Sequence, residues 1–444
     1  MNELLQPGMT VQTLHSRQMC DVQGFLGSGG QGEVYRARWA GGSFALKWYF
    51  PHTATTEQRA ALEKLVEQHR APSDKFLWPL DIAEARDVPG FGYIMRLREP
   101  RFKSLVDLMT GRIDPSFRAL VTAGLQLVDS FYKLHADGLC YRDISFGNAF
   151  FDPQTGEVLI CDNDNVAENR SGLGGVYGTP DFMAPEIVRG KAKPSRQTDL
   201  YSLAVLLFYI FHISHPLLGK KVLSIRCWDL PAREKLLGSE PVFIFDPNDR
   251  SNAADSREVE AGANAVSYWR IYPKFLREAF IRAFTTGIRD PDHGRVMEGE
   301  WRSVLSRLRD SIFYCSLCGK ENFYDSDAAK ATQGRSTDCW SCKKEPQLPF
   351  RIQIGKSVVM LTHTAQLHPH HMDDKLDFDF NAVVGEVVRH PQKPDVWGLK
   401  NCGQNRWVMT AADGAIKDVE PGRSVPLAPN VKVNFGKFEG EIRY

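Results

Sequence analysis

Residues 141–148 read YRDISFGN, a loop sequence in which an asparagine follows an aspartate by five residues. Asp143 and Asn148 therefore offer two side-chain oxygens on one loop, which follows a predicted helix starting at Phe117. An apolar strand over residues 158–161 then ends in Asp162, a third oxygen donor. Hard cations such as magnesium prefer ligands of this kind. The segment predicts a magnesium-dependent site.

A glycine-rich turn lies upstream, where residues 27–34 read GSGGQGEV. It leads into a predicted strand at 33–39 and, after Gly41-Gly42, into a second strand at 44–49. A dinucleotide-binding turn would lead into a helix instead, so the hairpin favours ATP. The return strand carries Lys47, which can pair with phosphates, although a lysine here could also be an ordinary surface residue.

In this order the motifs resemble the protein kinase family, over about residues 20–310. The resemblance implies that Asp143 orients the substrate hydroxyl and accepts its proton, while Asn148 and Asp162 bind magnesium. It further implies that residues 96–98 link the two lobes and that the enzyme is specific for serine or threonine. The residues expected to bind ATP are Gly27, Ser28, Gly29, Gly30, Gln31, Gly32, Val34, Ala45, Lys47, Met95 and Leu97.

Kinases also pair the strand lysine with a helical glutamate. The predicted helix at 56–69 contains three candidates, Glu57, Glu63 and Glu67. We choose Glu63 from its distance to Pro72, and Glu67 remains an alternative because it lies one helical turn away.

Residues 178–186 read GTPDFMAPE and resemble the end of a kinase activation segment. The resemblance implies an ion pair between Glu186 and Arg295, and it places Asp199 at the start of a buried helix. Ser171 and Thr179 are candidate phosphorylation sites. A threonine at the second position also contacts the catalytic aspartate in many serine/threonine kinases.

Four residues depart from the family pattern. Tyr141 stands where kinases usually have histidine, and Ser145 replaces a lysine. Asn163 and Asp164 replace the aromatic residue and the glycine that follow the magnesium aspartate. Asp164 could add a metal or hydrogen-bond contact. A pseudokinase scaffold that binds nucleotide without turnover is the alternative. Every residue with direct phosphate or metal contact is kept, which favours an active and autophosphorylating enzyme.

Two cysteine pairs follow the kinase-like region. Cys315 and Cys318 form the first pair, and Cys339 and Cys342 form the second after 20 intervening residues. This spacing is typical of a zinc ribbon whose four thiolates hold a structural zinc ion. Unligated buried cysteines or a disulfide pair are the alternatives.

The last hundred residues alternate between apolar and polar positions, with turns at Gly414, Gly422 and Gly436. Parts of this region resemble the second half of a forkhead-associated domain. The Gly-Arg and Ser-x-x-His elements with which that family grips phosphothreonine are missing in the expected order. We therefore expect a docking or autoinhibitory β-sandwich.

The predicted fold is multidomain α+β. A bilobal protein kinase fold covers residues 1–310, with its N-lobe at about 20–95 and its C-lobe at about 99–310. A zinc ribbon with four cysteine ligands covers 311–346, and an all-β, forkhead-associated-like sandwich covers 347–444.

The overall composition indicates which kinds of binding partner to expect. The chain has 55 basic and 54 acidic side chains, so nothing favours nucleic acid. The longest apolar run, at about 200–211, is too short for a membrane span, and no signal-peptide pattern opens the chain, so we expect a cytosolic protein without membrane attachment. The architecture resembles bacterial kinases encoded beside a protein phosphatase and a von Willebrand A-domain protein in tellurite-resistance-linked systems. The resemblance implies these two partners, protein substrates and a role in stress signalling.

Overall fold

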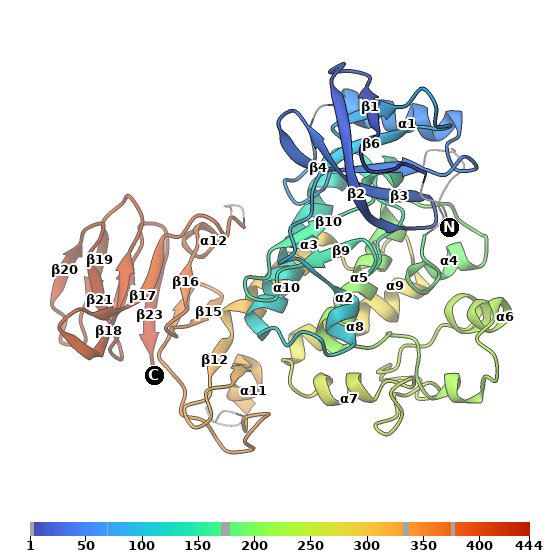
Figure 1. The fold of residues 1–444 in the computed structure, drawn as a ribbon. Helices are drawn as coiled ribbons and strands as arrows, with labels where there is room; N and C mark the ends of the chain where they lie inside the picture. The colour runs from blue at the N-terminus through green and yellow to red at the C-terminus, as the bar shows by residue number, and fades with distance from the viewer. Residues whose placement is uncertain (1–3, 69, 170–177, 332–336, 374–377) are drawn as a thin grey trace. The chain divides into compact units, whose positions relative to one another are not determined.

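The computed structural model describes residues 4–68, 70–169, 178–331, 337–373 and 378–444 (Figure 1). The chain forms two compact units. The first contains Met1–Pro115, Thr122–Ala265 and Ile281–Glu298, and the second contains Ser116–Val121, Val266–Phe280 and Gly299–Tyr444.

The first unit begins with a closed antiparallel barrel in the strand order β1-β2-β3-β4-β6-β5. Alternate side chains of these strands point inward, and Tyr35, Leu46 and Trp48 are fully buried there. The predicted hairpin is confirmed as β3 and β4. The strands are β1 (Thr10–Thr13), β2 (Met19–Ser28), β3 (Gly32–Trp39), β4 (Gly42–Tyr49), β5 (Asp81–Glu84) and β6 (Gly92–Arg96).

Helix α1 (Thr56–Glu67) accompanies the barrel. The Thr55 side chain caps its first turn by accepting a hydrogen bond from the Gln58 amide. Leu62, Leu65 and Val66 form its buried face. The helix predicted over 56–69 is therefore confirmed, with an end two residues earlier.

The helical lobe of the first unit is built around α5 (Arg196–His212). Every residue of α5 from Thr198 to His212 is buried, as expected of a helix that is apolar on all sides. The other helices and helical turns among the described residues before 311 are α2 (Leu105–Met109), α3 (Phe117–Ala136), η1 (Asn163–Asn165), η2 (Pro180–Phe182), α4 (Pro185–Val188), η3 (Lys220–Ser224), α6 (Leu230–Arg233), η4 (Glu234–Ser239), α7 (Ala263–Trp269), α8 (Lys274–Phe284), α9 (Thr286–Arg289) and α10 (Glu298–Asp310).

Two small sheets hold the loops of interest. β8 (Leu139–Cys140) pairs with β11 (Ala167–Glu168), and β9 (Ala149–Phe151) pairs with β10 (Val158–Ile160) and β7 (Lys103–Ser104). Residues 141–148 connect β8 to β9, and residues 161–166 connect β10 to β11. Because both loops join the same two sheets, they lie beside each other.

The second unit contains the hairpin β12 (Ile312–Tyr314) and β13 (Glu321–Phe323), followed by α11 (Ser326–Ala331). The spacing of apolar and polar residues over 299–313 predicts a helix over that whole range, but the helix ends earlier. Helix α10 stops at Asp310, because Ile312 and Phe313 pair with β13 as a strand.

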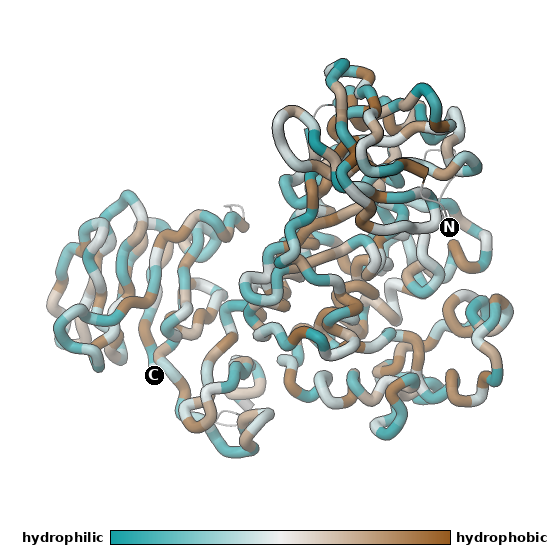
Figure 2. Tube along the Cα trace, in the orientation of Figure 1, coloured by the Kyte–Doolittle hydropathy of each residue, from teal (hydrophilic) through white to brown (hydrophobic). Residues whose placement is uncertain are grey.

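The C-terminal region is rich in β-strands, as predicted. Its two antiparallel sheets share one core, in which Ile352, Leu399 and Ile442 are fully buried. Hydrophobic and hydrophilic positions alternate along this part of the chain (Figure 2). The first sheet consists of β14 (Arg351–Ile354), β15 (Ser357–Met360), β19 (Trp407–Thr410), β20 (Ile416–Val419), β22 (Lys432–Asn434) and β23 (Glu439–Arg443). The second consists of β16 (Gln366–Leu367), β17 (Gly385–His390), β18 (Lys393–Asn401) and β21 (Ser424–Pro426), and α12 (Pro369–Met372) follows β16.

Within the described ranges, no helix has both the length and the apolar character that crossing a membrane requires.

Candidate active site

A cleft of about 670 Å³ in the first unit collects most of the predicted site residues. Its walls come from the β2–β3 turn, β4, the end of β6, and the two loops 141–148 and 161–166. All of the residues predicted to bind ATP line it, and Asp143 and Asp162 do so as well. The fold therefore brings these separately predicted residues to one place.

The glycine-rich turn contains two kinds of glycine. A Cβ atom added at Gly27, Gly29 or Gly30 would meet no atom within 4 Å. A Cβ at Gly32 would lie 2.1 Å from the Trp48 carbonyl oxygen, so Gly32 is required for the pairing of β3 with β4. The first three glycines are not needed for packing and leave open space in which backbone amides can approach a phosphate.

Asp143 is held by two neighbouring side chains. Thr179 Oγ1 donates to Asp143 Oδ1 (2.8 Å), and Asn148 Nδ2 donates to Asp143 Oδ2 (3.1 Å). Burial raises the pKa of Asp143, and these hydrogen bonds offset part of the rise. The carboxylate is fixed in orientation at the cleft.

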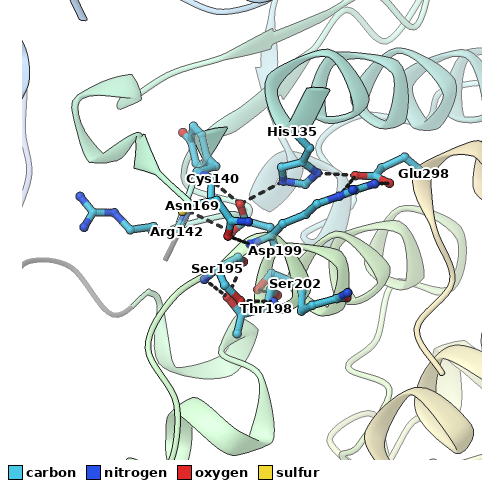
Figure 3. A network of polar contacts seen from close by, with 12 residues as sticks. His135, Cys140, Arg142, Asn169, Ser195, Thr198, Asp199, Ser202 and Glu298 are labelled. Carbon is cyan, nitrogen blue, oxygen red and sulfur yellow. Dashed lines mark hydrogen bonds and ion pairs between the residues drawn. The ribbon is translucent and has the colours of Figure 1, made fainter. Parts of the chain in front are cut away.

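The loop that carries Asp143 is anchored from below by Asp199 on α5 (Figure 3). Asp199 accepts hydrogen bonds from the backbone amides of Tyr141 and Arg142, the second at 2.9 Å. His135 lies between Asp199 and Glu298 and contacts both carboxylates, with 3.1 Å from its Nε2 to Asp199. The buried helix therefore fixes the backbone immediately before the candidate catalytic aspartate.

Charges in this network stabilise one another. Burial alone would lower the pKa of His135, but its bonds to Asp199 and Glu298 raise it above the usual value. Burial alone would raise the pKa of Glu298, yet hydrogen bonds from His135 and Arg196 lower it to about 2. The imidazolium and the Glu298 carboxylate are thus both favoured in the folded chain.

Tyr141, which stands where the family usually has histidine, is fully buried and donates from its hydroxyl to the Cys161 carbonyl oxygen. Cys161 in turn donates from its amide to the Asn148 carbonyl oxygen (2.8 Å). These contacts tie the loop 141–148 to the residue preceding Asp162. The tyrosine is a structural brace between the two loops.

Asp162 has a left-handed backbone conformation, with φ at 50°. Such conformations cost energy in residues other than glycine and gather at functional sites. Its Oδ1 lies 3.3 Å from Lys47 Nζ. Burial raises the pKa of Asp162, and the Lys47 charge opposes that rise.

Lys47 is where the structure departs most from expectation. Its Nζ lies 3.0 Å and 3.1 Å from the two carboxylate oxygens of Asp164, and 3.1 Å from Gln31 Oε1. Burial alone would lower the pKa of Lys47, but the charges of Asp164 and Asp162 raise it. The lysine is buried and ion-paired.

The predicted pairing of Lys47 with Glu63 is wrong in this structure. Glu63 Oε1 instead lies 3.0 Å from Arg59 on the same face of α1, and Arg59 also contacts Glu84. Glu57 and Glu67 are exposed. The carboxylate that pairs with Lys47 is that of Asp164, not that of Glu63. Asp164 is 117 residues from Lys47 in sequence, so the spacing of residues along α1 could not have identified it.

Sequence reasoning also missed the residues around Asp164. The hydroxyls of Tyr49 and Tyr93 both donate to its carboxylate. Asp164 stands where a typical kinase has glycine, and this departure was the available signal. Its partners lie on other elements, so no local pattern links them.

Further landmarks are placed as follows. Arg295 donates to Glu186 Oε1 at 2.6 Å, which confirms the predicted ion pair. The Thr179 hydroxyl is engaged with Asp143. Ser171 lies outside the described residues.

In the second unit the four predicted cysteines form one cluster. The sulfurs of Cys315 and Cys342 are 3.8 Å apart, and those of Cys318 and Cys339 are 3.7 Å apart. Four sulfurs at about 2.3 Å from a tetrahedral zinc ion would be separated by about 3.8 Å. The donor set fits zinc.

The two cysteine turns share one hydrogen-bond pattern. Cys315 donates from its amide to Lys320 and accepts from the Gly319 amide, and Cys339 does the same with Lys344 and Lys343. Burial alone would raise the pKa of Cys339, but backbone and Asn322 donors lower it to about 6. A backbone donor would lower the pKa of Cys342, but the three neighbouring sulfurs raise it to about 11. A cation bound to the four sulfurs would favour their thiolate forms.

With this geometry established, comparison with known proteins shows which family part of the chain is similar to. Residues 20–232 match the family described as "Protein kinase domain". This domain implies a bilobal kinase fold, in agreement with the barrel and the helical lobe. ATP and magnesium are the cofactors that such a domain implies.

Individual relatives are serine/threonine kinases. The chain is 27% identical over 214 residues to the DNA damage-responsive serine/threonine-protein kinase RqkA of Deinococcus radiodurans. The aligned segment covers 46% of the chain and 31% of that protein. It is 28% identical over 186 residues to a probable serine/threonine-protein kinase of Dictyostelium discoideum (41% of the chain, 13% of that protein). It is 24% identical over 206 residues to human ribosomal protein S6 kinase alpha-4 (43% of the chain, 26% of that protein).

The chain thus spans less than a third of the length of each of these relatives. Together, the family match and the relatives support the prediction of a protein serine/threonine kinase.

Proposed function

We propose that this protein transfers the γ-phosphoryl group of ATP to serine or threonine hydroxyls of proteins. The observation that most directly supports this proposal is the cleft, which is lined by the glycine-rich turn, Lys47, Asp143 and Asp162. Phosphoryl transfer depends mainly on positioning and on electrostatic stabilisation. These are the two properties that the cleft supplies.

Each residue has a role in this proposal. Asp143 lies at the cleft with an oriented carboxylate and accepts the proton of the substrate hydroxyl. Asp162 and Asn148 hold magnesium, whose preference for oxygen ligands they satisfy and which neutralises phosphate charge when bound. Lys47 orients the phosphates, and Val34, Ala45 and Met95 supply apolar walls for the adenine.

Serine/threonine specificity is supported by the contact between Thr179 and Asp143 and by the similarity to serine/threonine kinases. Incubation of the protein with ATP and magnesium, followed by mass spectrometry, should detect phosphoserine or phosphothreonine on the protein itself or on an added substrate. The same incubation with Asp162→Ala should give none. Phosphotyrosine as the main product would contradict the specificity.

A pseudokinase scaffold is the second candidate, and one observation favours it. The Lys47 ammonium is already paired with two carboxylates of the chain itself. A scaffold would bind ATP with thermal stabilisation but without transfer. Asp143→Asn would then preserve function in cells, whereas it abolishes the function of an active kinase.

We also propose that Cys315, Cys318, Cys339 and Cys342 hold a structural zinc ion in a ribbon. The sulfur distances and the repeated hydrogen-bond pattern support this assignment. Metal analysis of the purified protein should give one zinc equivalent, and Cys315→Ser should lose it. Cys402→Ser is the matched control, because Cys402 lies outside the cluster. Equal zinc in Cys315→Ser and wild type would contradict the site.

For the C-terminal sandwich we propose docking or autoinhibition, with a likeness to forkhead-associated domains but without phosphothreonine binding. We place the protein in the bacterial cytosol, in a stress-signalling system linked to tellurite resistance. The partners of the sandwich there would be a protein phosphatase and a von Willebrand A-domain protein. Phosphate transfer to a purified von Willebrand A-domain protein by the full chain, lost on removal of residues 347–444, tests the docking role. Undiminished transfer after that removal would contradict it.

A further inference from the structure

Asp164 sits at the centre of a fully buried polar cluster. Its side chain has no solvent exposure, and both carboxylate oxygens accept a hydrogen bond from Lys47 Nζ, at 3.0 Å and 3.1 Å. Tyr93 donates a third bond to Oδ1 (3.2 Å), and Tyr49 donates a fourth to Oδ2. A buried carboxylate is tolerated only when its oxygens are paired in this way.

This cluster joins the lysine to the turn that follows the magnesium aspartate. Asp164 belongs to η1 (Asn163–Asn165), and Asp162 immediately precedes that turn. Lys47 Nζ contacts both aspartates, with the Asp162 oxygen slightly farther at 3.3 Å. The phosphate-binding lysine and the magnesium aspartate are therefore positioned by a single short segment of the chain.

We propose that Asp164 is the positioning residue of Lys47, replacing the helical glutamate that the resemblance to kinases assigned to α1. This inference rests on the proposed kinase function. It deepens that function by naming how the phosphate-binding lysine is held.

Helix α1 contributes a neutral side chain to the cluster. Gln58 Nε2 donates to the Tyr49 hydroxyl and to the Asp164 carbonyl oxygen, both at 3.2 Å. The glutamate chosen from sequence, Glu63, is instead paired with Arg59. If α1 moved away from the barrel, the contacts of the Gln58 amide would be lost, but the ion pair between Lys47 and Asp164 would remain.

The glycine-rich turn joins the same network. Gln31 Oε1 accepts from Lys47 Nζ (3.1 Å), and Gln31 Nε2 donates to Asn165 Oδ1 (3.0 Å). The turn is in this way connected to η1 without passing through α1. The position of the Lys47 ammonium is therefore set by Gln31 in the turn and by Asp164 in η1, and not by a residue of α1.

Asp164→Asn tests the proposal because it keeps the shape of the side chain and removes its charge. We expect kcat to fall by about 100-fold, while the dissociation constant for magnesium-free ATP, measured by calorimetry, changes by less than about threefold. A merely structural role would weaken nucleotide binding and lower the unfolding temperature together with the rate.

A second substitution that restores kcat tests the proposal more sharply. Gln58 Nε2 lies 3.2 Å from the Tyr49 hydroxyl, which also contacts the Asp164 carboxylate, so Gln58→Glu places a carboxylate at the edge of the same cluster. We therefore expect Asp164→Asn/Gln58→Glu to recover about tenfold of the lost kcat, whereas Gln58→Glu alone, beside the Asp162 and Asp164 carboxylates, should lower kcat by a few-fold. Glu63→Gln is the matched control and should keep wild-type kcat and nucleotide binding.

These outcomes separate the inference from the function on which it rests. A wild-type protein no more active than Asp143→Asn would refute the kinase function itself. An active wild type with undiminished kcat in folded Asp164→Asn, or with a loss of about 100-fold in Glu63→Gln, would overturn the role of Asp164. If Asp164→Asn fails to fold, the double variant decides: a folded double variant more than about 1000-fold below wild type in kcat would also overturn it.

Discussion

At the scale of single residues, the site is built from side chains that hold one another. Asp143 is fixed by Thr179 and Asn148, and Lys47 is fixed by Asp164 and Asp162. Preorganisation of this kind lowers the reorganisation that a reaction needs. The departures from the kinase pattern also have physical roles, since Tyr141 braces the loop that would otherwise carry a histidine.

The contact between Thr179 and Asp143 gives a direct prediction. Thr179→Val keeps the volume of the side chain but removes the 2.8 Å hydrogen bond to Oδ1. We expect kcat to fall about tenfold because the carboxylate is then free to rotate. Thr179→Ser, which keeps the hydroxyl, should stay within about threefold of wild type. Equal kcat in the valine and serine variants would argue against an orienting role.

At the scale of elements, sequence patterns placed the strands and helices well and their distant contacts less well. The hairpin β3–β4 and helix α5 were predictable because periodicity and turn residues are local signals. The end of α10 was not, because β13 recruits residues 312–314 into a strand. The partner of Lys47 was missed for the same reason, since the barrel and η1 meet only in the folded chain.

Two glycines of one turn should behave differently. Gly29→Ala adds a methyl group where the chain leaves open space, so we expect an unchanged unfolding temperature and weaker ATP binding, by about tenfold. Gly32→Ala places a methyl group against the Trp48 carbonyl and should destabilise the domain by about 2 kcal/mol or more. Thermal unfolding and calorimetry on both variants check this. Tighter ATP binding in Gly29→Ala would contradict a phosphate-binding turn.

The network of His135, Asp199 and Glu298, which anchors the loop 141–148, predicts a pH dependence of stability. The pKa of Glu298 is lowered to about 2 in the folded chain, so its contribution is complete above its usual value of 4.5 and is lost as the pH falls towards 2. The pKa of His135 is raised, so its contribution is complete below 6.5 and is lost as the pH rises through the folded value. Both contributions are present together between pH 4.5 and 6.5.

Glu298→Gln should therefore destabilise the protein most within that interval, by roughly 1–3 kcal/mol. Unfolding temperatures of wild type and variant from about pH 3 to about pH 8 measure the difference. Glu300→Gln, farther along α10 and exposed, is the comparison variant. A difference that stays constant across the range would show that these charges do not carry the stabilisation.

At the scale of the whole molecule, one chain joins a region that matches the protein kinase domain family to a cysteine cluster and a β-rich C-terminal region. The kinase motifs could be predicted because phosphate and metal chemistry restricts residue type and spacing. The zinc spacing was equally informative, and the four sulfurs meet as expected. The role of the C-terminal sandwich rests on weaker signals, since its sequence shows alternation and turns but lacks the Gly-Arg and Ser-x-x-His elements in the expected order.

The most direct test of the central claim compares phosphate transfer by wild type and Asp143→Asn. Both proteins would be incubated with radiolabelled ATP, magnesium and a generic protein substrate, after calorimetry has shown that both bind ATP. The account predicts incorporation by wild type and a loss of at least about 1000-fold in Asp143→Asn with nucleotide binding retained. Equal incorporation by the two proteins would contradict it.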